Sequence, residues 1–215
     1  MDKNTPSGQM DSPQMQALIE RAKNNRSTII MVCIIVVLII FGLVLYFFIA
    51  NSNSAKADEM AGRGDMAQND SIAMVYYKQA AEMGHKSGNR SAAKVAIALY
   101  NDGKYQEAID YLKDTDLNSK VVGPGVFSLL GDCYVNLHQY PEALKAYDKA
   151  IAKADENPSL VPLFLVKKAD VYREQQNYED EYKALKTLVD KYPQFARSTP
   201  NVMKYFERAK AACGK

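Results

Sequence analysis

The chain repeats one arrangement of small and aromatic residues at nearly constant spacing, and this restricts its fold more than any other feature. Tyr105, Tyr140 and Tyr178 are 35 and 38 residues apart, and a small residue precedes each of them by nine positions. These small residues are Ala96, Gly131 and Ala169. A period near ~34 residues is typical of units that each form one pair of antiparallel helices. A single pair cannot bury its apolar face, so the sequence predicts a stack of several pairs.

The order of residue types within each unit resembles the tetratricopeptide repeat (TPR), in which a small residue of helix A lets helix B approach closely. We therefore predict an all-α, TPR-like solenoid of about three full repeats. A degenerate first repeat at 55–85, with Ala61 at the small position, and a C-terminal capping helix at 199–212 complete it. The third unit carries Glu181 where a small residue is usual, which casts doubt on close packing there. A solenoid leaves a concave face, which favours binding over chemistry.

A second feature is the uncharged, apolar segment Ile29–Ala50. Its 22 residues would form a helix of about 33 Å, enough to cross the ~30 Å core of a bilayer. Two alternatives are a buried helix and a cleaved signal peptide, for which Ala55-Lys56-Ala57 resembles a cleavage site. The segment is longer than the apolar run of a signal peptide, which has about 7–15 residues, so we predict a retained transmembrane helix.

Basic residues on the two sides of this segment predict its orientation. Arg21, Lys23 and Arg26 precede it closely, whereas Lys56 and the more distant Arg63 follow it. The positive-inside rule places the N-terminus in the cytoplasm and the repeats outside it. We therefore predict a partly disordered cytoplasmic tail at 1–28 and a transmembrane helix at 29–50. A linker with the degenerate repeat would follow at 51–88, and the TPR domain with its cap at 89–215.

Composition argues against nucleic-acid binding and against catalysis. The chain has 27 Lys and Arg against 25 Asp and Glu, a net charge of +2, so no basic field is expected. His85 and His138 are the only histidines, and neither lies at metal-ligand spacing from a second ligand pair. No phosphate-binding glycine motif and no nucleophile motif is present. We expect no enzymatic activity, cofactor, metal or small-molecule substrate, and a membrane-bound protein whose partners are proteins.

The predicted partner-binding residues lie on the helix A faces that would line the concave groove. Such a face mixes apolar and polar groups of both charges, which suits protein segments. Tyr100, Asp132 and Arg173, one from each full repeat, are expected to contribute most. The full set is Arg90, Ile97, Tyr100, Asn101, Ser128, Asp132, Val135, Asn136, Val166, Lys167, Asp170 and Arg173.

Two stretches resemble the bacterial ancillary Sec-translocon subunit family, especially its Bacteroidetes type. They are Val121-Val122-Gly123-Pro124 followed by Leu130-Gly131-Asp132-Cys133-Tyr134, and Leu163 to Tyr172 with Tyr192-Pro193. The resemblance covers most of residues 20–212. It implies an accessory subunit beside the Sec channel in the bacterial inner membrane, whose periplasmic TPR domain contacts translocating chains or chaperones. The alternatives are a scaffold of another envelope complex for secretion or motility, and a membrane-tethered regulator that acts through its cytoplasmic tail.

Overall fold

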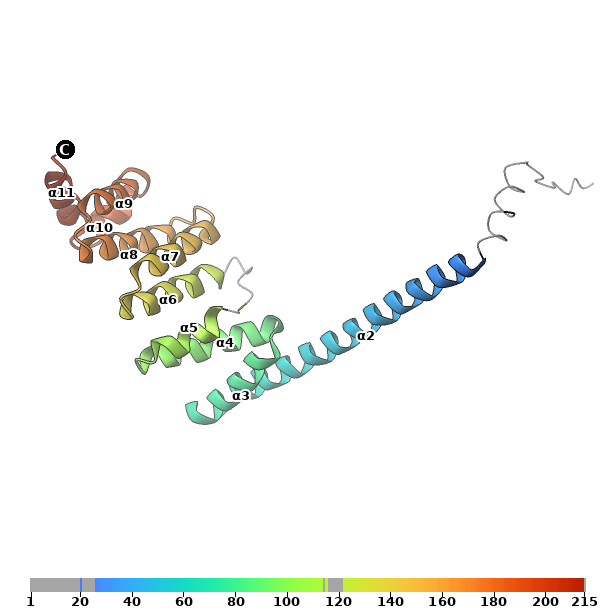
Figure 1. Ribbon diagram of the computed structural model, residues 1–215. Coiled ribbons are helices and arrows are strands. Elements are labelled where there is room, and N and C mark those ends of the chain that lie inside the picture. The colour runs from blue at the N-terminus through green and yellow to red at the C-terminus, as the bar shows by residue number, and fades with distance from the viewer. Residues whose placement is uncertain (1–19, 21–25, 114, 116–121, 215) are drawn as a thin grey trace, which may run out of the picture. The chain divides into compact units, whose positions relative to one another are not determined.

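The computed structural model describes residues 20, 26–113, 115 and 122–214, and the regular elements in these ranges are helices (Figure 1). They are α2 (Arg26–Asp65), α3 (Asp70–Met83), α4 (His85–Asn101), α5 (Tyr105–Lys113), α6 (Gly123–Asn136), α7 (Tyr140–Ala154), α8 (Val161–Glu174), α9 (Tyr178–Lys191), α10 (Pro193–Ser198) and α11 (Val202–Ala212). This confirms the predicted all-α class with TPR-like repeats. Apart from residues 20 and 26–28, the predicted tail lies outside the described residues.

The chain divides into two units, Met1–Ser52 and Asn53–Lys215. In the first unit, α2 carries the apolar segment, and its side chains from Ile29 to Ile49 are exposed. Within the described part of the chain, α2 is the one helix long and apolar enough to cross a membrane. The helix does not end with the apolar segment at Ala50 but continues through the polar residues Asn51–Ser54 to Asp65.

The second unit is a stack of helix pairs. The C-terminal part of α2 precedes α3, and the pairs α4–α5, α6–α7 and α8–α9 follow, with α10 and α11 after the last pair (Figure 1). Two large clusters of buried side chains fill the stack. One joins α4, α5 and α6 around Leu99 and Leu112, and the other joins α7, α8, α9 and the final helices around Leu165 and Leu188.

Helix α4 begins at His85, four residues before the predicted start of the TPR domain. Gly88 explains the difference, because a Cβ atom there would lie 2.5 Å from the backbone oxygen of Ala80. Ser87 is buried beside it and donates a hydrogen bond to Asp58. Close packing against α3 and the preceding helix therefore stabilises a helical turn that local propensity disfavours.

Size complementarity between helix A and helix B recurs through the stack. A Cβ atom at Gly131 would lie 2.4 Å from Tyr147, and one at Gly64 would lie 2.5 Å from Tyr77. At the positions equivalent to Gly131 and Tyr147, the other repeats pair Ala96 with Leu112 and Ala169 with Leu185, all of them buried. Glycine thus meets tyrosine, whereas each of the other repeats carries alanine and leucine at the equivalent positions of one buried cluster. In the first repeat the glycine that meets a tyrosine is Gly64, one residue before the end of α2. Ala61, the predicted small residue, lies three positions earlier and is also buried. That helix A ends about one turn earlier, which shifts the contact along the helix.

The third repeat is irregular at Glu181, where a small residue is usual, and the contacts of this side chain show how the fold tolerates it. The equivalent residues of the earlier repeats, Ala108 and Ala143, are fully buried, and so is the carboxylate of Glu181. Arg208 of α11 donates to both of its oxygens, at 2.8 and 2.9 Å. Arg173 of α8 lies 3.6 Å from one of them. The two arginines compensate the carboxylate for lost hydration, so α8 and α9 still pack together.

Left-handed turns connect helix A to helix B at equivalent positions, occupied by Gly103, His138 and Gln176 with φ of 74°, 57° and 56°. Only glycine adopts this conformation without steric cost. Gln176→Gly is therefore expected to stabilise the domain by about 0.5–1 kcal/mol. The backbone strain that glycine relieves in the folded state exceeds the conformational entropy that it adds to the unfolded chain. Thermal unfolding measures this as a rise in Tm. The control is Gln175→Gly, at φ −80°, which should lower the Tm. Equal shifts for both variants would contradict the expectation.

Candidate partner-binding surface

The predicted partner-binding residues lie on α4, α6 and α8, the helix A members of the three full repeats. Their accessibility differs. Ile97 is 50% exposed, and Arg90, Asn101 and Asn136 are also exposed. Ser128 is buried at 6% exposure, so its side chain does not line an open surface. The remaining members are partly buried: Tyr100, Asp132, Val135, Val166, Lys167, Asp170 and Arg173.

Asp132 is held by groups of its own chain. The hydroxyl of Tyr147 on α7 donates to Oδ1 at 2.7 Å, and the ammonium of Lys167 on α8 donates to the same oxygen at 2.7 Å. The Asp132 side chain is only 22% exposed. Burial, followed by the nearby carboxylate, raises the pKa of the Tyr147 phenol above its ordinary value, so the hydroxyl remains a donor. This cluster fastens helix A and helix B of one repeat to helix A of the next.

The same arrangement occurs in the first repeat. Asp65 follows Gly64 as Asp132 follows Gly131, and it accepts hydrogen bonds from the Tyr77 hydroxyl at 2.7 Å and from the Lys94 ammonium at 2.5 Å. The Lys94 and Tyr77 hydrogen bonds hold the pKa of Asp65 below its usual value. The Asp65 side chain is 57% exposed, so this ion pair contributes less to stability than its more buried counterpart. The recurrence of Gly-Asp at 64–65 and 131–132 could have indicated both clusters from the sequence. The predicted set of residues did not include Asp65 and Lys94.

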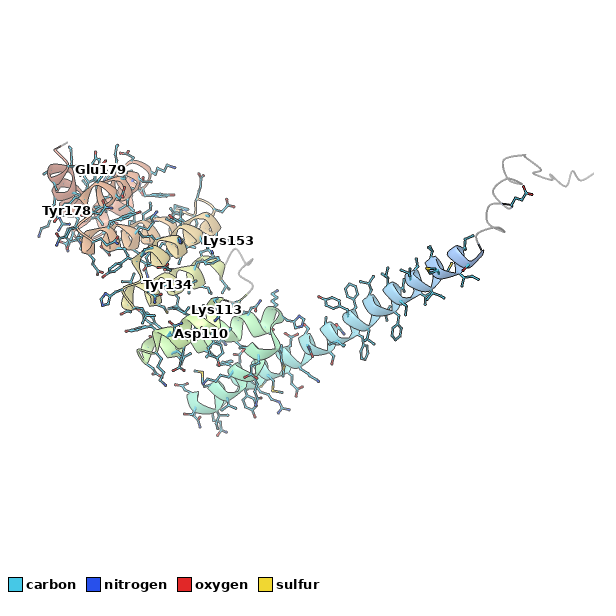
Figure 2. The ribbon with its side chains drawn as sticks, viewed as in Figure 1. Asp110, Lys113, Tyr134, Lys153, Tyr178 and Glu179 are labelled. Carbon is cyan, nitrogen blue, oxygen red and sulfur yellow. The ribbon has the colours of Figure 1, made fainter. Side chains whose placement is uncertain are left out.

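Arg173 is also engaged within the protein. It donates to Asp170 on its own helix, lies beside Glu181, and its guanidinium is 4.0 Å from the centroid of the Tyr205 ring. Arg208 lies over the ring of the same tyrosine and near that of Tyr178. Tyr178 is the first residue of α9 (Figure 2). Arg173 and Asp132 therefore stabilise the stack, whatever further contacts they make.

Tyr100 and Asn136 connect the helix A faces of neighbouring repeats. The Asn136 amide donates to the Tyr100 hydroxyl at 3.4 Å and to the backbone oxygen of Asp132 at 2.8 Å. The Tyr100 ring packs edge-on against Tyr105, with centroids 5.4 Å apart. Burial raises the pKa of the Tyr100 phenol, which stays neutral at physiological pH. The contact between the two helix A faces at this point is therefore polar but uncharged.

In the described ranges, no group of three or more His, Cys, Asp and Glu side chains is placed to hold a metal ion. Cys133 is fully buried, and burial raises the pKa of its thiol to about 12, so it is protonated and unreactive at neutral pH.

Comparisons with known proteins agree with this geometry. A family model described as "Anaphase-promoting complex, cyclosome, subunit 3" matches residues 66–150, and one described as "Tetratricopeptide repeat" matches residues 129–194. No curated protein matches the sequence.

Two solved structures are similar to the chain. A crystal structure of MamA protein is 18% identical, covering 77% of this chain and 83% of its own, with a TM-score of 0.52. A second MamA crystal structure is 19% identical, covering 72% of this chain and 92% of its own, with a TM-score of 0.49. At 18% identity the first likeness concerns the fold alone. The match to the tetratricopeptide-repeat model over residues 129–194, together with the succession of helix pairs, identifies the stack as TPR-type repeats.

Proposed function

We propose that the protein is a membrane-anchored interaction module whose repeats bind other proteins outside the cytoplasm. The observation that carries this proposal is the attachment of one long apolar helical segment, with its side chains exposed, to a TPR stack. TPR folds are typically non-enzymatic scaffolds for protein partners.

For the partner, we propose the protein-export channel of the bacterial inner membrane. Support comes from the resemblance of Val121–Tyr134 and Leu163–Tyr172 to ancillary Sec-translocon subunits. In that setting the periplasmic repeats would meet chains as they leave the channel, or chaperones that receive them. Helix A side chains on three successive repeats would offer such a chain a row of weak contacts, each able to release it.

Mild crosslinking of intact membranes, followed by purification of the full chain and identification of the joined proteins, tests the partner. Recovery of the Sec channel is expected. Recovery of outer-membrane or motor proteins in its place would favour a scaffold of another envelope complex. Loss of the partner on deletion of residues 1–28 alone would favour a regulator acting through its tail.

The orientation can be tested by fusing reporters after Lys215. A reporter active only in the periplasm is expected to work, and one that fluoresces only in the cytoplasm is expected to stay dark, because basic residues concentrate before Ile29. The mature N-terminus, mapped by mass spectrometry, should lie before Ile29. Fluorescence from the cytoplasmic reporter would refute the orientation, and an N-terminus at Asp58 would refute the anchor.

A further inference from the structure

A cavity of about 300 Å³ lies between α7, α8 and α9, and none of the predicted partner-binding residues lines it. Its wall comes from the last turns of α7 and α9, both helix B members, and from the first turns of α8. Ligand pockets in proteins measure roughly 300–1,000 Å³. The cavity is at the small end of this range, so it suits one side chain or a small ligand and not a cofactor.

The cavity is apolar inside and charged at its mouth. Val161 and Leu165 of α8 line it and are 5% and 7% exposed. Ile151 of α7 also lines it and is partly buried. The charged lining residues are all exposed: Asp155, Glu156 and Lys191.

The loop between α7 and α8 that carries the two carboxylates is held by Asn157. Its side-chain oxygen accepts hydrogen bonds from the backbone N–H groups of Ser159 and Leu160, at 2.9 and 3.2 Å. Its carbonyl oxygen accepts one from the N–H of Val161 at 3.0 Å, and its own N–H donates to Ala154, the last residue of α7. The cavity is therefore preformed, and a ligand binds a preformed site with less loss of conformational entropy.

The charge around the mouth favours a cation. Asp155 and Glu156 contribute two carboxylates against the single ammonium of Lys191, and within the described ranges no ion pair joins Glu156 to Lys191. Helices α7 and α9 both end at the cavity, and the last carbonyls of a helix carry partial negative charge. The hydroxyl of Thr187, which also lines the cavity, donates to the carbonyl oxygen of Lys183 at 3.0 Å. The Thr187 oxygen keeps lone pairs that can accept a further hydrogen bond.

We infer that this cavity binds the side chain of a lysine or arginine from a protein partner. The aliphatic stem would lie against Ile151 and Leu165, with the cationic group between Glu156 and the ends of α7 and α9. Lysine and arginine bury their stems along apolar surface and keep the charged head near water, which matches an apolar floor below a charged mouth. The inference rests on the proposed function, which supplies a protein partner, and it assigns that partner a contact outside the helix A surface.

Methyl NMR of the full chain in detergent tests the inference, because Ile151, Val161 and Leu165 report from inside the cavity. The probes are capped pentapeptides Ser-Gly-X-Gly-Ser, in which X is lysine, arginine, norleucine, diaminopropionic acid or glutamic acid. The lysine and arginine peptides are expected to shift these methyl signals. They should bind at least about threefold more tightly than the norleucine peptide, which lacks the charge, and the diaminopropionic acid peptide, which lacks the long stem. High salt should reduce the advantage over norleucine, because it screens charges.

The salt n-butylammonium chloride offers the same stem and charge as a free amine. It is expected to bind more weakly than the lysine peptide, because the peptide also covers the rim of the cavity. Equal or tighter binding of n-butylammonium would overturn the assignment to a protein side chain.

Glu156→Gln is expected to weaken binding of the lysine peptide about threefold to fivefold, because it removes a carboxylate from the mouth. Lys191→Gln removes the competing ammonium and should tighten binding about twofold to threefold. The matched control is Glu142→Gln, the same charge change at an exposed site about 18 Å along α7 from its end. It should change the affinity less than about 1.5-fold, because salt screens charges beyond ~10 Å.

Three results would overturn the inference. They are methyl signals that no peptide shifts, norleucine or glutamic acid peptides that bind as tightly as the lysine peptide, and equal effects of Glu156→Gln and Glu142→Gln. Crosslinking in membranes tests the proposed function separately, so a failed titration leaves that result unchanged.

Discussion

Gly131→Leu should destabilise the TPR domain by about 3 kcal/mol or more, at or beyond the upper end of ordinary overpacking. The first atom added to Gly131 would lie 2.4 Å from the Tyr147 ring, before the rest of the leucine is placed. Tyr147 is 2% exposed and its hydroxyl is bonded to Asp132, so the ring cannot turn away without breaking that bond. Urea unfolding of the full chain in detergent, followed by circular dichroism, measures the loss.

Gly125→Leu on the same helix is the matched control. A Cβ atom there meets nothing within 4 Å, so this variant is expected to be neutral or slightly stabilised. The other repeats suggest a rescue, because they carry buried alanine and leucine at the positions equivalent to Gly131 and Tyr147. Gly131→Ala should therefore cost less in a Tyr147→Leu background than in the wild-type protein. Equal stability of Gly131→Leu and Gly125→Leu would show that α6 and α7 are not packed as described.

Arg208→Met is the second change with a large expected effect, about 2–3 kcal/mol of lost stability. It removes the two hydrogen bonds that the Glu181 carboxylate accepts from α11, at 2.8 and 2.9 Å. The carboxylate is fully buried and would keep its ion pair with Arg173, at 3.6 Å. The Arg208 side chain is 43% exposed, so water compensates part of the loss, and the effect falls below that of a fully buried pair. Urea unfolding measures it.

A double-mutant cycle separates the ion pair from general packing. Arg208→Met combined with Glu181→Gln should be more stable than Arg208→Met alone, because the second change removes the unpaired buried charge. Lys186→Met, which breaks an exposed ion pair with Asp190 on the same helix as Glu181, should cost less than about 0.5 kcal/mol. A double variant no more stable than the single one would mean that the carboxylate does not depend on Arg208.

Local sequence determined most of the architecture of this protein. The spacing of Tyr105, Tyr140 and Tyr178 identified the repeats, and the uncharged length of Ile29–Ala50 identified the candidate membrane helix. These features could be predicted because helical periodicity, turn residues and apolar length act over at most a few turns. The positions of Ala96, Gly131 and Ala169 at helix contacts follow from the same periodicity.

Tertiary structure decided which side chains are available to a partner. Asp132 is paired with Lys167, 35 residues away, and Glu181 with Arg208, 27 residues away. These contacts exist only after neighbouring repeats stack, so the sequence pattern placed Asp132 and Arg173 on a binding face without showing that they are already engaged. Stacking of the helices also determines that α4 begins at His85 and that Gly64 packs against Tyr77. Close packing between helices can override local propensity, and only the assembled stack determines where it does so.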